Sequence, residues 1–407
     1  MKIPHVQSIH SGDASHLTGR GRPVRLPPLG HQLDEMPVKD VKNRKDECIR
    51  VSVPGRICLH GEHQDFLGLS VIAMAIDLRF VIKAWPRNDN KFVIHMPDLP
   101  ERDELSPSQV LEYRHHRDYL PAGVNVLRRR GLEFSRGYDF LFTSTVPVNA
   151  GVSSSSAMCV GWAKTLLALA GAPAADNPAE VARIAHQTEV LEFNEPGGTM
   201  DHYTTSLGGL VYIDCVNPIR VTPIDCDLTG FVLGNSLEKK DTKGTLRASR
   251  QAVEAGIAEL SKRIPGFSLR ETPTDRILAE LPNLPKEMAV KLQANVTNRD
   301  LCQEARRMLE SGGLDTARFG QMLDAHHAQL RDKLGISTPK LESLITASKQ
   351  AGALGGKLNG SGGGGTMIAY APGCEAEVAA AIDKCGGRGY IVKKAAGAII
   401  EHKSEDT

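Results

Sequence analysis

A glycine-rich segment near the end of the chain most strongly constrains how this sequence can fold. Residues 359–370 read NGSGGGGTMIAY, so a β-prone run follows the glycines directly. The segment contains Gly360, Ser361, Gly362, Gly363, Gly364 and Gly365. Glycine loses more backbone freedom on folding than any other residue, so this density indicates unusual backbone angles or close approach to a ligand. A flexible hinge is the alternative, but a predicted helix before the segment and a strand after it argue against a hinge.

A serine run joins a predicted strand to a predicted helix. Residues 139–146 alternate apolar and polar side chains, and residues 157–170 follow a helical pattern. The linking segment, PVNAGVSSSSA, contains Gly151, Ser153, Ser154, Ser155 and Ser156. The N-terminal end of a helix favours a phosphate group, and serine hydroxyls can ligate Mg²⁺. The segment is not a Walker A loop because it lacks Gly-Lys-Ser/Thr, and a serine-rich cap or linker is the alternative.

A third segment concentrates charge in a glycine-containing turn between predicted strands. Residues 54–69 read PGRICLHGEHQDFLGL and contain Arg56, Glu62, His63 and Asp65. Charged groups so dense in an apolar neighbourhood are costly unless they bind something. Two carboxylates three residues apart can each accept hydrogen bonds from neighbouring hydroxyls of a polyol. A surface turn with an ordinary ion pair is the alternative.

Two further acidic residues lie between the serine run and the glycine-rich segment. Glu189 falls on a helix predicted over residues 179–193, and Asp201 follows a Pro-Gly-Gly turn. Phosphoryl transfer repeatedly uses acidic groups for two purposes, to hold the metal and to orient or deprotonate the attacking hydroxyl. Glu189 and Asp201 can divide these roles. A solvated helix face for Glu189 and a helix N-cap for Asp201 are the alternatives.

Bulk properties indicate an ordinary globular enzyme. The 407 residues fit two domains, and 49 basic against 48 acidic residues give no reason to expect nucleic acid or a membrane surface as partner. The sequence shows no apolar run long enough to span a bilayer and no secretory start. The eight cysteines lack C-x-x-C spacing, so we expect free thiols in a reducing compartment and a cytoplasmic protein.

The order of segments along the chain predicts the domain organisation. Residues 1–45 read as an irregular extension with a short element around residues 33–41. We expect an N-terminal domain over residues 46–215 and a C-terminal domain over residues 216–407. Long amphipathic helices are predicted at residues 246–264, 322–334 and 339–351. The chain ends with a strand at 366–370, a helix at 375–385 and a strand at 389–394, which suits an α+β domain.

Taken in order, the motifs resemble those of the GHMP kinases, and most closely those of galactokinases. PGRICLHGEHQDFLG is similar to the galactokinase signature, and PVNAGVSSSSA to the second motif of the superfamily. GGTMDHYTTSLGG resembles the galactokinase segment G-I-M-D-Q, and LNGSGGGGTMIAY resembles the third motif. The resemblance implies two domains, the first like ribosomal protein S5 domain 2 and the second ferredoxin-like, with the active site between them.

The resemblance also assigns roles to single residues. Asp201 matches the catalytic aspartate that accepts the hydroxyl proton, and Arg56 matches the arginine that stabilises it. Mg²⁺ is implied on Ser155 and Glu189, with Ser154 or Ser156 as alternatives to Ser155. Sugar binding is implied for Glu62, His63 and Asp65, and ATP binding for Gly151, Ser153, Ser154, Ser155 and Ser156. The glycine-rich loop comprises Gly360, Ser361, Gly362, Gly363 and Gly364.

Two departures from galactokinases lie where the substrate is expected. Phe66-Leu67-Gly68-Leu69 replaces Tyr-Asn-Gly-Gly, and residues 235–251 offer no counterpart of a sugar-contacting tyrosine. We therefore expect an ATP- and Mg²⁺-dependent kinase for a hydroxyl, the anomeric one, of galactose or a related hexose or uronic acid. A galactokinase-like sensor without turnover and a mevalonate-type kinase are the alternatives. We expect a monomer or a weak homodimer.

Overall fold

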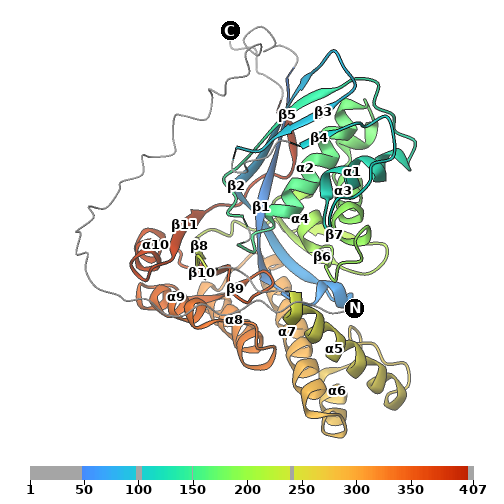
Figure 1. The fold of residues 1–407 in the computed structure, drawn as a ribbon. Coiled ribbons are helices and arrows are strands. Elements are labelled where there is room, and N and C mark those ends of the chain that lie inside the picture. Colours follow the sequence, from blue (N-terminus) through green and yellow to red (C-terminus); the bar gives the residue numbers. More distant parts are fainter. Residues whose placement is uncertain (1–47, 98–102, 149, 239–242, 402–407) are drawn as a thin grey trace, which may run out of the picture. The chain divides into compact units, whose positions relative to one another are not determined.

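The computed structural model describes residues 48–97, 103–148, 150–238 and 243–401 (Figure 1). The predicted N-terminal extension and its short element at residues 33–41 lie outside these ranges. Within them, strands form two separate sheets, and no helix is long and apolar enough to cross a membrane. None of the eight cysteines, all of which lie within these ranges, forms a disulfide.

The larger sheet holds the first motif. Its strands run in the order β12-β1-β2-β5-β3-β4, and β6 and β7 extend it from another part of β2. Their bounds are β1 Ile49–His60, β2 Val71–Pro86, β3 Phe92–His95, β4 Asp103–Leu105, β5 Tyr138–Ser144, β6 Leu210–Asp214, β7 Arg220–Pro223 and β12 Ile399–Glu401. Strands β7 and β12 follow residue 215 in the sequence, so later parts of the chain return to the sheet that its first strands form.

A layer of helices packs on this sheet (Figure 1). It contains α1 Tyr119–Arg128, α2 Ser154–Leu169, α3 Pro178–His186 and α4 Met200–Leu207. The buried indole of Trp162 on α2 lies edge-on to Phe140 and Phe92 of the sheet, with ring centroids 4.9 and 6.1 Å apart. Such edge-to-face pairs add to the area that the rings bury, so they fix α2 firmly on the sheet.

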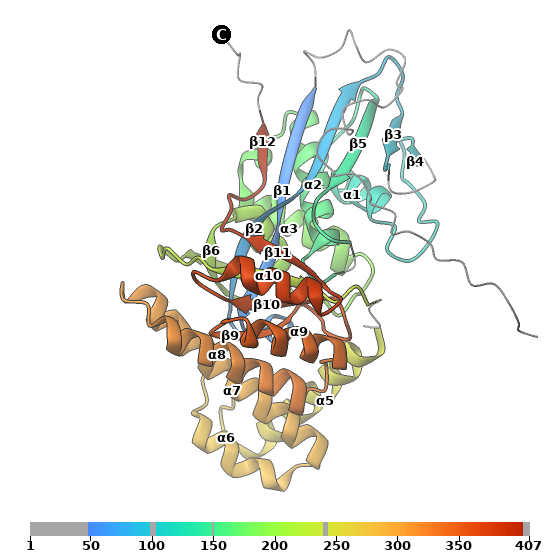
Figure 2. The same cartoon turned by 90° about the vertical axis from the view of Figure 1, so that its left-hand side faces the viewer.

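The smaller sheet is antiparallel, in the order β11-β8-β10-β9. Its bounds are β8 Phe231–Asn235, β9 Gly355–Asn359, β10 Thr366–Tyr370 and β11 Arg388–Val392. Alternate side chains face opposite sides of a strand. Accordingly, Ile368 and Tyr370 pack in the core with helix α8 (Thr316–Ala328), whereas Met367 and Ala369 pack with α9 (Pro339–Gln350) and α10 (Glu375–Lys384) (Figure 2).

A group of helices forms a further apolar cluster beside the sheets (Figure 1). It comprises α5 Lys243–Arg263, α6 Thr274–Glu280 and the long helix α7 Lys286–Glu310. The sequence analysis missed α7. This helix buries Asn295, Asn298 and Arg299 together with apolar residues, so the clear apolar stripe that predicts an amphipathic helix is absent.

Most predicted elements are confirmed, with two corrections around the motifs. The strand-helix-strand ending and the helices α2, α5 and α9 lie where they were predicted. Strand β9, not a helix, immediately precedes the glycine-rich loop. Strand β1 continues through the first motif as far as His60, so only the later part of the motif is a turn. Residues 71–84 favoured one strand turning into another, but Val71–Pro86 is one long strand. Both strands are almost continuously buried near the motif, so they lack the alternation that marks strand ends.

Candidate active site

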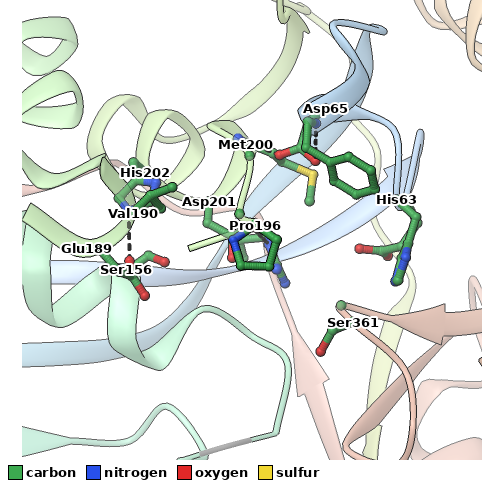
Figure 3. Close-up of a pocket in the computed structure, with 16 residues that line it drawn as sticks. His63, Asp65, Ser156, Glu189, Val190, Pro196, Met200, Asp201, His202 and Ser361 are labelled. Carbon is green, nitrogen blue, oxygen red and sulfur yellow. Dashed lines mark hydrogen bonds and ion pairs between the residues drawn. The ribbon is translucent and has the colours of Figure 1, made fainter. Parts of the chain in front are cut away.

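A cavity of about 150 Å³ collects residues from all the segments singled out in the sequence (Figure 3). Its walls come from the turn after β1, the start of α2, the segment between α3 and α4, and the glycine-rich loop. They include Arg56, Glu62, His63, Asp65, Ser156, Glu189, Asp201, His202, Gly360 and Ser361. Segments as much as 300 residues apart in sequence, such as β1 and the start of the glycine-rich loop, thus meet around one space.

Arg56 and Asp201 form a partly buried ion pair at the cavity wall. The Nε atom of Arg56 donates to Oδ1 of Asp201 at 2.7 Å, and its Nη1 donates to the Gly151 carbonyl at 2.6 Å. Burial alone would raise the pKa of Asp201, but the charge of Arg56 and the nearby Ser153 hydroxyl bring it below its usual value. Asp201 is therefore a carboxylate at neutral pH, and its side chain stays 28% exposed.

Glu189 occupies a π-helical turn, Gln187–Leu191, directly after α3. The predicted helix over residues 179–193 therefore changes register at this point, and such π turns are frequent at functional sites. One Glu189 carboxylate oxygen lies 2.7 Å from Nε2 of His202. Burial would raise the pKa of Glu189, but His202 and the hydroxyls of Ser155 and Ser156 lower it.

The serine loop presents the start of helix α2 to the site. Ser153, just before the helix, adopts a left-handed backbone conformation with φ of 62°, and α2 begins at Ser154. Ser156 is buried and lines the cavity, whereas Ser155 is exposed, although its hydroxyl also helps to lower the pKa of Glu189. The first N–H groups of a helix have no partner within the helix and carry partial positive charge, so this end suits an anion such as phosphate.

The glycine-rich loop lies directly against the serine loop. A Cβ atom on Gly360 would lie 2.6 Å from the Gly151 carbonyl oxygen, and Gly360 has φ of +83°. The loop is fastened on its other side, where the Gly363 N–H donates to the Ile336 carbonyl at 2.8 Å. Gly362 and Gly364 also have positive φ. The positive φ angles confirm the unusual backbone conformation predicted from the sequence, and the close approach at Gly360 is to the serine loop.

Asp65 links the first motif to the helix that carries Asp201. Its Oδ1 accepts from the Phe66 N–H at 3.0 Å, and its Oδ2 accepts from the Met200 N–H at 3.1 Å, at the first residue of α4. A Cβ atom on Gly198 would overlap this carboxylate, so the Pro-Gly-Gly turn leaves room for it. Burial and the nearby charge of Asp201 raise the pKa of Asp65 to about 6.

The other two predicted sugar-binding residues also reach the cavity. Glu62 is buried, and its Oε2 accepts from Nζ of Lys357 at 2.8 Å. His63 has φ of 61°, and its ring lies edge-on to Phe66 at 6.3 Å between centroids. Phe66, one of the departures from galactokinases, lines the cavity as well.

The sequence analysis missed two polar residues next to the site, His202 and Lys357. His202 stands directly after Asp201 in the motif TMDH, where the galactokinase segment has glutamine, and this difference was a usable signal. Lys357 gave no signal, because its partner Glu62 is 295 residues away.

Comparisons with known proteins agree with this arrangement. Family profiles match three parts of the chain: the GHMP kinases N terminal domain over residues 119–209, the GHMP kinases C terminal domain over residues 304–387, and the galactokinase galactose-binding signature over residues 40–85. A galactokinase of Roseiflexus sp. is 30% identical over 325 residues, which cover 78% of this chain and 82% of the relative. The chain belongs to the GHMP kinase family.

Other GHMP kinases are similarly related. A mevalonate kinase of Thermococcus sibiricus is 28% identical over 360 residues, 85% of this chain and 96% of the relative. Among solved structures, Lactococcus lactis galactokinase complexed with galactose superimposes with a TM-score of 0.78 at 21% identity, covering 88% of this chain and 95% of that one. The predicted two-domain GHMP kinase fold is confirmed, and the chain is a galactokinase-like phosphotransferase with an alcohol group as acceptor.

Proposed function

We propose that this GHMP kinase transfers the γ-phosphate of ATP to the anomeric hydroxyl of galactose or of a related hexose or uronic acid. One observation carries the proposal: the Arg56–Asp201 pair opens onto the same cavity as Glu189 and Ser156. A carboxylate that can orient a hydroxyl thus lies beside groups suited to phosphate and metal. The match of residues 40–85 to the galactose-binding signature supports a sugar as the acceptor.

In this proposal, Asp201 orients the acceptor hydroxyl and receives its proton. As the new O–P bond forms, the bond between the γ-phosphorus and the bridging oxygen breaks, and ADP leaves with that electron pair. Arg56 keeps Asp201 in place and offsets its charge. Because the pKa of Asp201 is lowered, we expect positioning and electrostatics to contribute more than basicity.

The residues present fit ATP and Mg²⁺. The N-terminal end of α2 offers N–H groups to the phosphates, and the backbone contact at Gly360 leaves no side chain between the two loops. Mg²⁺ is commonly held by one or two carboxylates together with substrate phosphates, which agrees with Glu189 and a serine hydroxyl as protein ligands. Ser155 remains the predicted ligand, with Ser156 as the alternative from the cavity wall. When bound, Mg²⁺ would neutralise charge on the β- and γ-phosphates.

The alternatives find less support. A sugar sensor that catalyses no reaction does not need a proton acceptor beside groups suited to phosphate and metal. Arg56, Glu189 and Asp201 are nevertheless all present around one cavity. Mevalonate kinases are among the relatives, but the match to a galactose-binding signature and the carboxylates Glu62 and Asp65 favour a polyol. The uronic acid and the unmodified hexose remain to be separated by a substrate screen.

The substitution Asp201→Asn tests the proposal. It keeps the shape of the side chain but removes the proton acceptor, so sugar-dependent ADP formation should fall by roughly 10²–10⁴-fold. Affinity for Mg-ATP, measured by calorimetry, should change little, because the serine loop is intact. Asp89→Asn, on the turn before β3, is the matched control and should retain normal turnover. Normal turnover in Asp201→Asn would show that Asp201 is not the acceptor.

A further inference from the structure

A lysine from the smaller sheet is fully buried against the first motif. Lys357 lies on β9, and its side chain has no exposed surface. Its Nζ donates to Oε2 of Glu62 at 2.8 Å and to the Cys58 carbonyl at 2.9 Å. Glu62 is itself only 2% exposed, so the two charges meet away from solvent.

Stability alone does not account well for this pair. Removing two charges from water costs several kcal/mol per ion, and a well-packed apolar pair of similar volume is often as stable or more so. What a buried cation does provide is a fixed orientation for its partner. With Oε2 held by Lys357, the Glu62 carboxylate has little freedom to rotate away from the cavity that it lines.

The surroundings leave Glu62 as the counter-charge of Lys357. His60 and His326 are buried nearby and stack with ring centroids 5.6 Å apart. Burial, and then the charge of Lys357, lower the pKa of His60 to about 3, and burial lowers that of His326 as well. Both rings are therefore neutral at physiological pH and do not compete with Lys357 for the Glu62 carboxylate.

A second β9 side chain contacts both β1 and the serine loop. Asn359 is two residues after Lys357, so both side chains point to the same face of the strand. Oδ1 of Asn359 accepts from the Cys58 N–H at 2.8 Å, and its Nδ2 donates to the Gly151 carbonyl at 2.9 Å. Lys357 thus contacts the expected sugar side and Asn359 the serine loop.

We propose that Lys357 is a positioning residue for substrate recognition: it holds one oxygen of Glu62 so that the carboxylate accepts a hydrogen bond from a substrate hydroxyl. The proposal rests on the proposed sugar kinase function. It extends the site to the smaller sheet, with Lys357 supporting the sugar side through Glu62 and Asn359 supporting the serine loop. Because a held carboxylate only accepts, the substrate must offer a donor at that position.

The substitution Lys357→Met tests the proposal through a separation of kinetic constants. With galactose as the probe, KM for sugar should rise by roughly tenfold or more, while kcat and KM for ATP stay within about twofold. Asn359→Ala should show the reverse, a higher KM for ATP with little effect on galactose. Lys164→Met removes a buried lysine that donates to the Ala175 carbonyl and is the matched control. It should leave KM for galactose and KM for ATP near normal.

A double substitution keeps the test decisive if Lys357→Met folds poorly. Glu62→Gln with Lys357→Met removes both charges, which spares the protein an unpaired buried ion. If Lys357 acts through Glu62, the galactose affinity of the double variant, measured by calorimetry, should lie within about twofold of that of Glu62→Gln alone. Two results would overturn the proposal. One is much weaker galactose binding by the double variant than by Glu62→Gln; the other is an equal change in KM for galactose, KM for ATP and kcat in Lys357→Met.

Calorimetry also separates this proposal from the function on which it rests. Wild-type protein that binds galactose without forming ADP would refute the kinase function but would leave Lys357 testable through galactose affinity. Wild-type protein that binds none of a panel of sugars would refute both.

Discussion

Arg56 shows how a single residue organises the site. Its guanidinium donates to Asp201 and to the Gly151 carbonyl, so one side chain joins the Asp201 carboxylate to the serine loop. Burial would lower the pKa of Arg56, but Asp201 and Glu62 raise it, so the charge is permanent. A lysine offers a single point of charge and cannot reproduce this forked geometry.

Asp65 predicts a pH dependence. Its pKa of about 6 is above the usual aspartate value, so the carboxylate is lost as pH falls through that value. For this group, the contribution to folding stability is fully present at low pH and is lost as pH rises through about 6. The effect on substrate has the opposite sign, because a protonated Asp65 is a poorer acceptor for a sugar hydroxyl.

We therefore expect kcat/KM for galactose to fall by roughly tenfold at about one pH unit below the pKa of Asp65. The profile of Asp65→Asn should show no such break. A wild-type profile that is flat between about pH 7 and pH 5, or a break that persists in Asp65→Asn, would contradict this role.

At the scale of elements, the two loops around the cavity depend on close backbone contact. Gly360→Ala would add a left-handed alanine and a clash with the Gly151 carbonyl. Gly312→Ala is the matched control, because Gly312 has φ of +75° but no atom within 4 Å of its Cβ position. Gly312→Ala should lower the free energy of unfolding by about 1 kcal/mol.

Gly360→Ala should lose a further ~1–3 kcal/mol and raise KM for ATP, because the serine loop must move. Urea denaturation and steady-state kinetics measure the two effects. Equal losses of stability in both variants, with KM for ATP unchanged, would show that the two loops do not need this contact.

The elements also show what the sequence can and cannot predict. Loop chemistry is local, so the serine run before α2 and the glycine-rich loop were recognised from their residues. Lys357 was not, because its importance depends on β9 lying beside β1, and the strand pattern of β9 is hidden by Gly355 and Gly356. The π turn at Glu189 likewise has no local signature in a sequence that otherwise favours a helix.

At the scale of the whole molecule, the last described strand of the chain pairs with the first. Strand β12 pairs antiparallel with β1, the strand that leads into the first motif. The α+β class followed from the strand-helix-strand ending and the two-domain fold from the family resemblance. This return was not predicted, because three residues carry too little pattern to reveal a distant partner.

A pair of neighbouring isoleucines tests the role of β12. Ile400 packs on the core of the larger sheet, whereas Ile399 is 42% exposed. Ile400→Ala should lower the free energy of unfolding by about 1–2 kcal/mol, roughly half the cost for a fully buried site, and Ile399→Ala by clearly less. Urea denaturation measures both. Equal losses would mean that β12 contributes no packed face to the sheet.

The proposed function requires that this cavity transfers the γ-phosphate of ATP to a sugar hydroxyl. The direct measurement incubates the protein with Mg-ATP and a panel of free sugars, uronic acids and mevalonate, and identifies the product by ³¹P NMR. We expect ADP formation that depends on a sugar, with phosphate on the anomeric oxygen. ADP formation that no sugar stimulates, or phosphate found on mevalonate alone, would contradict it.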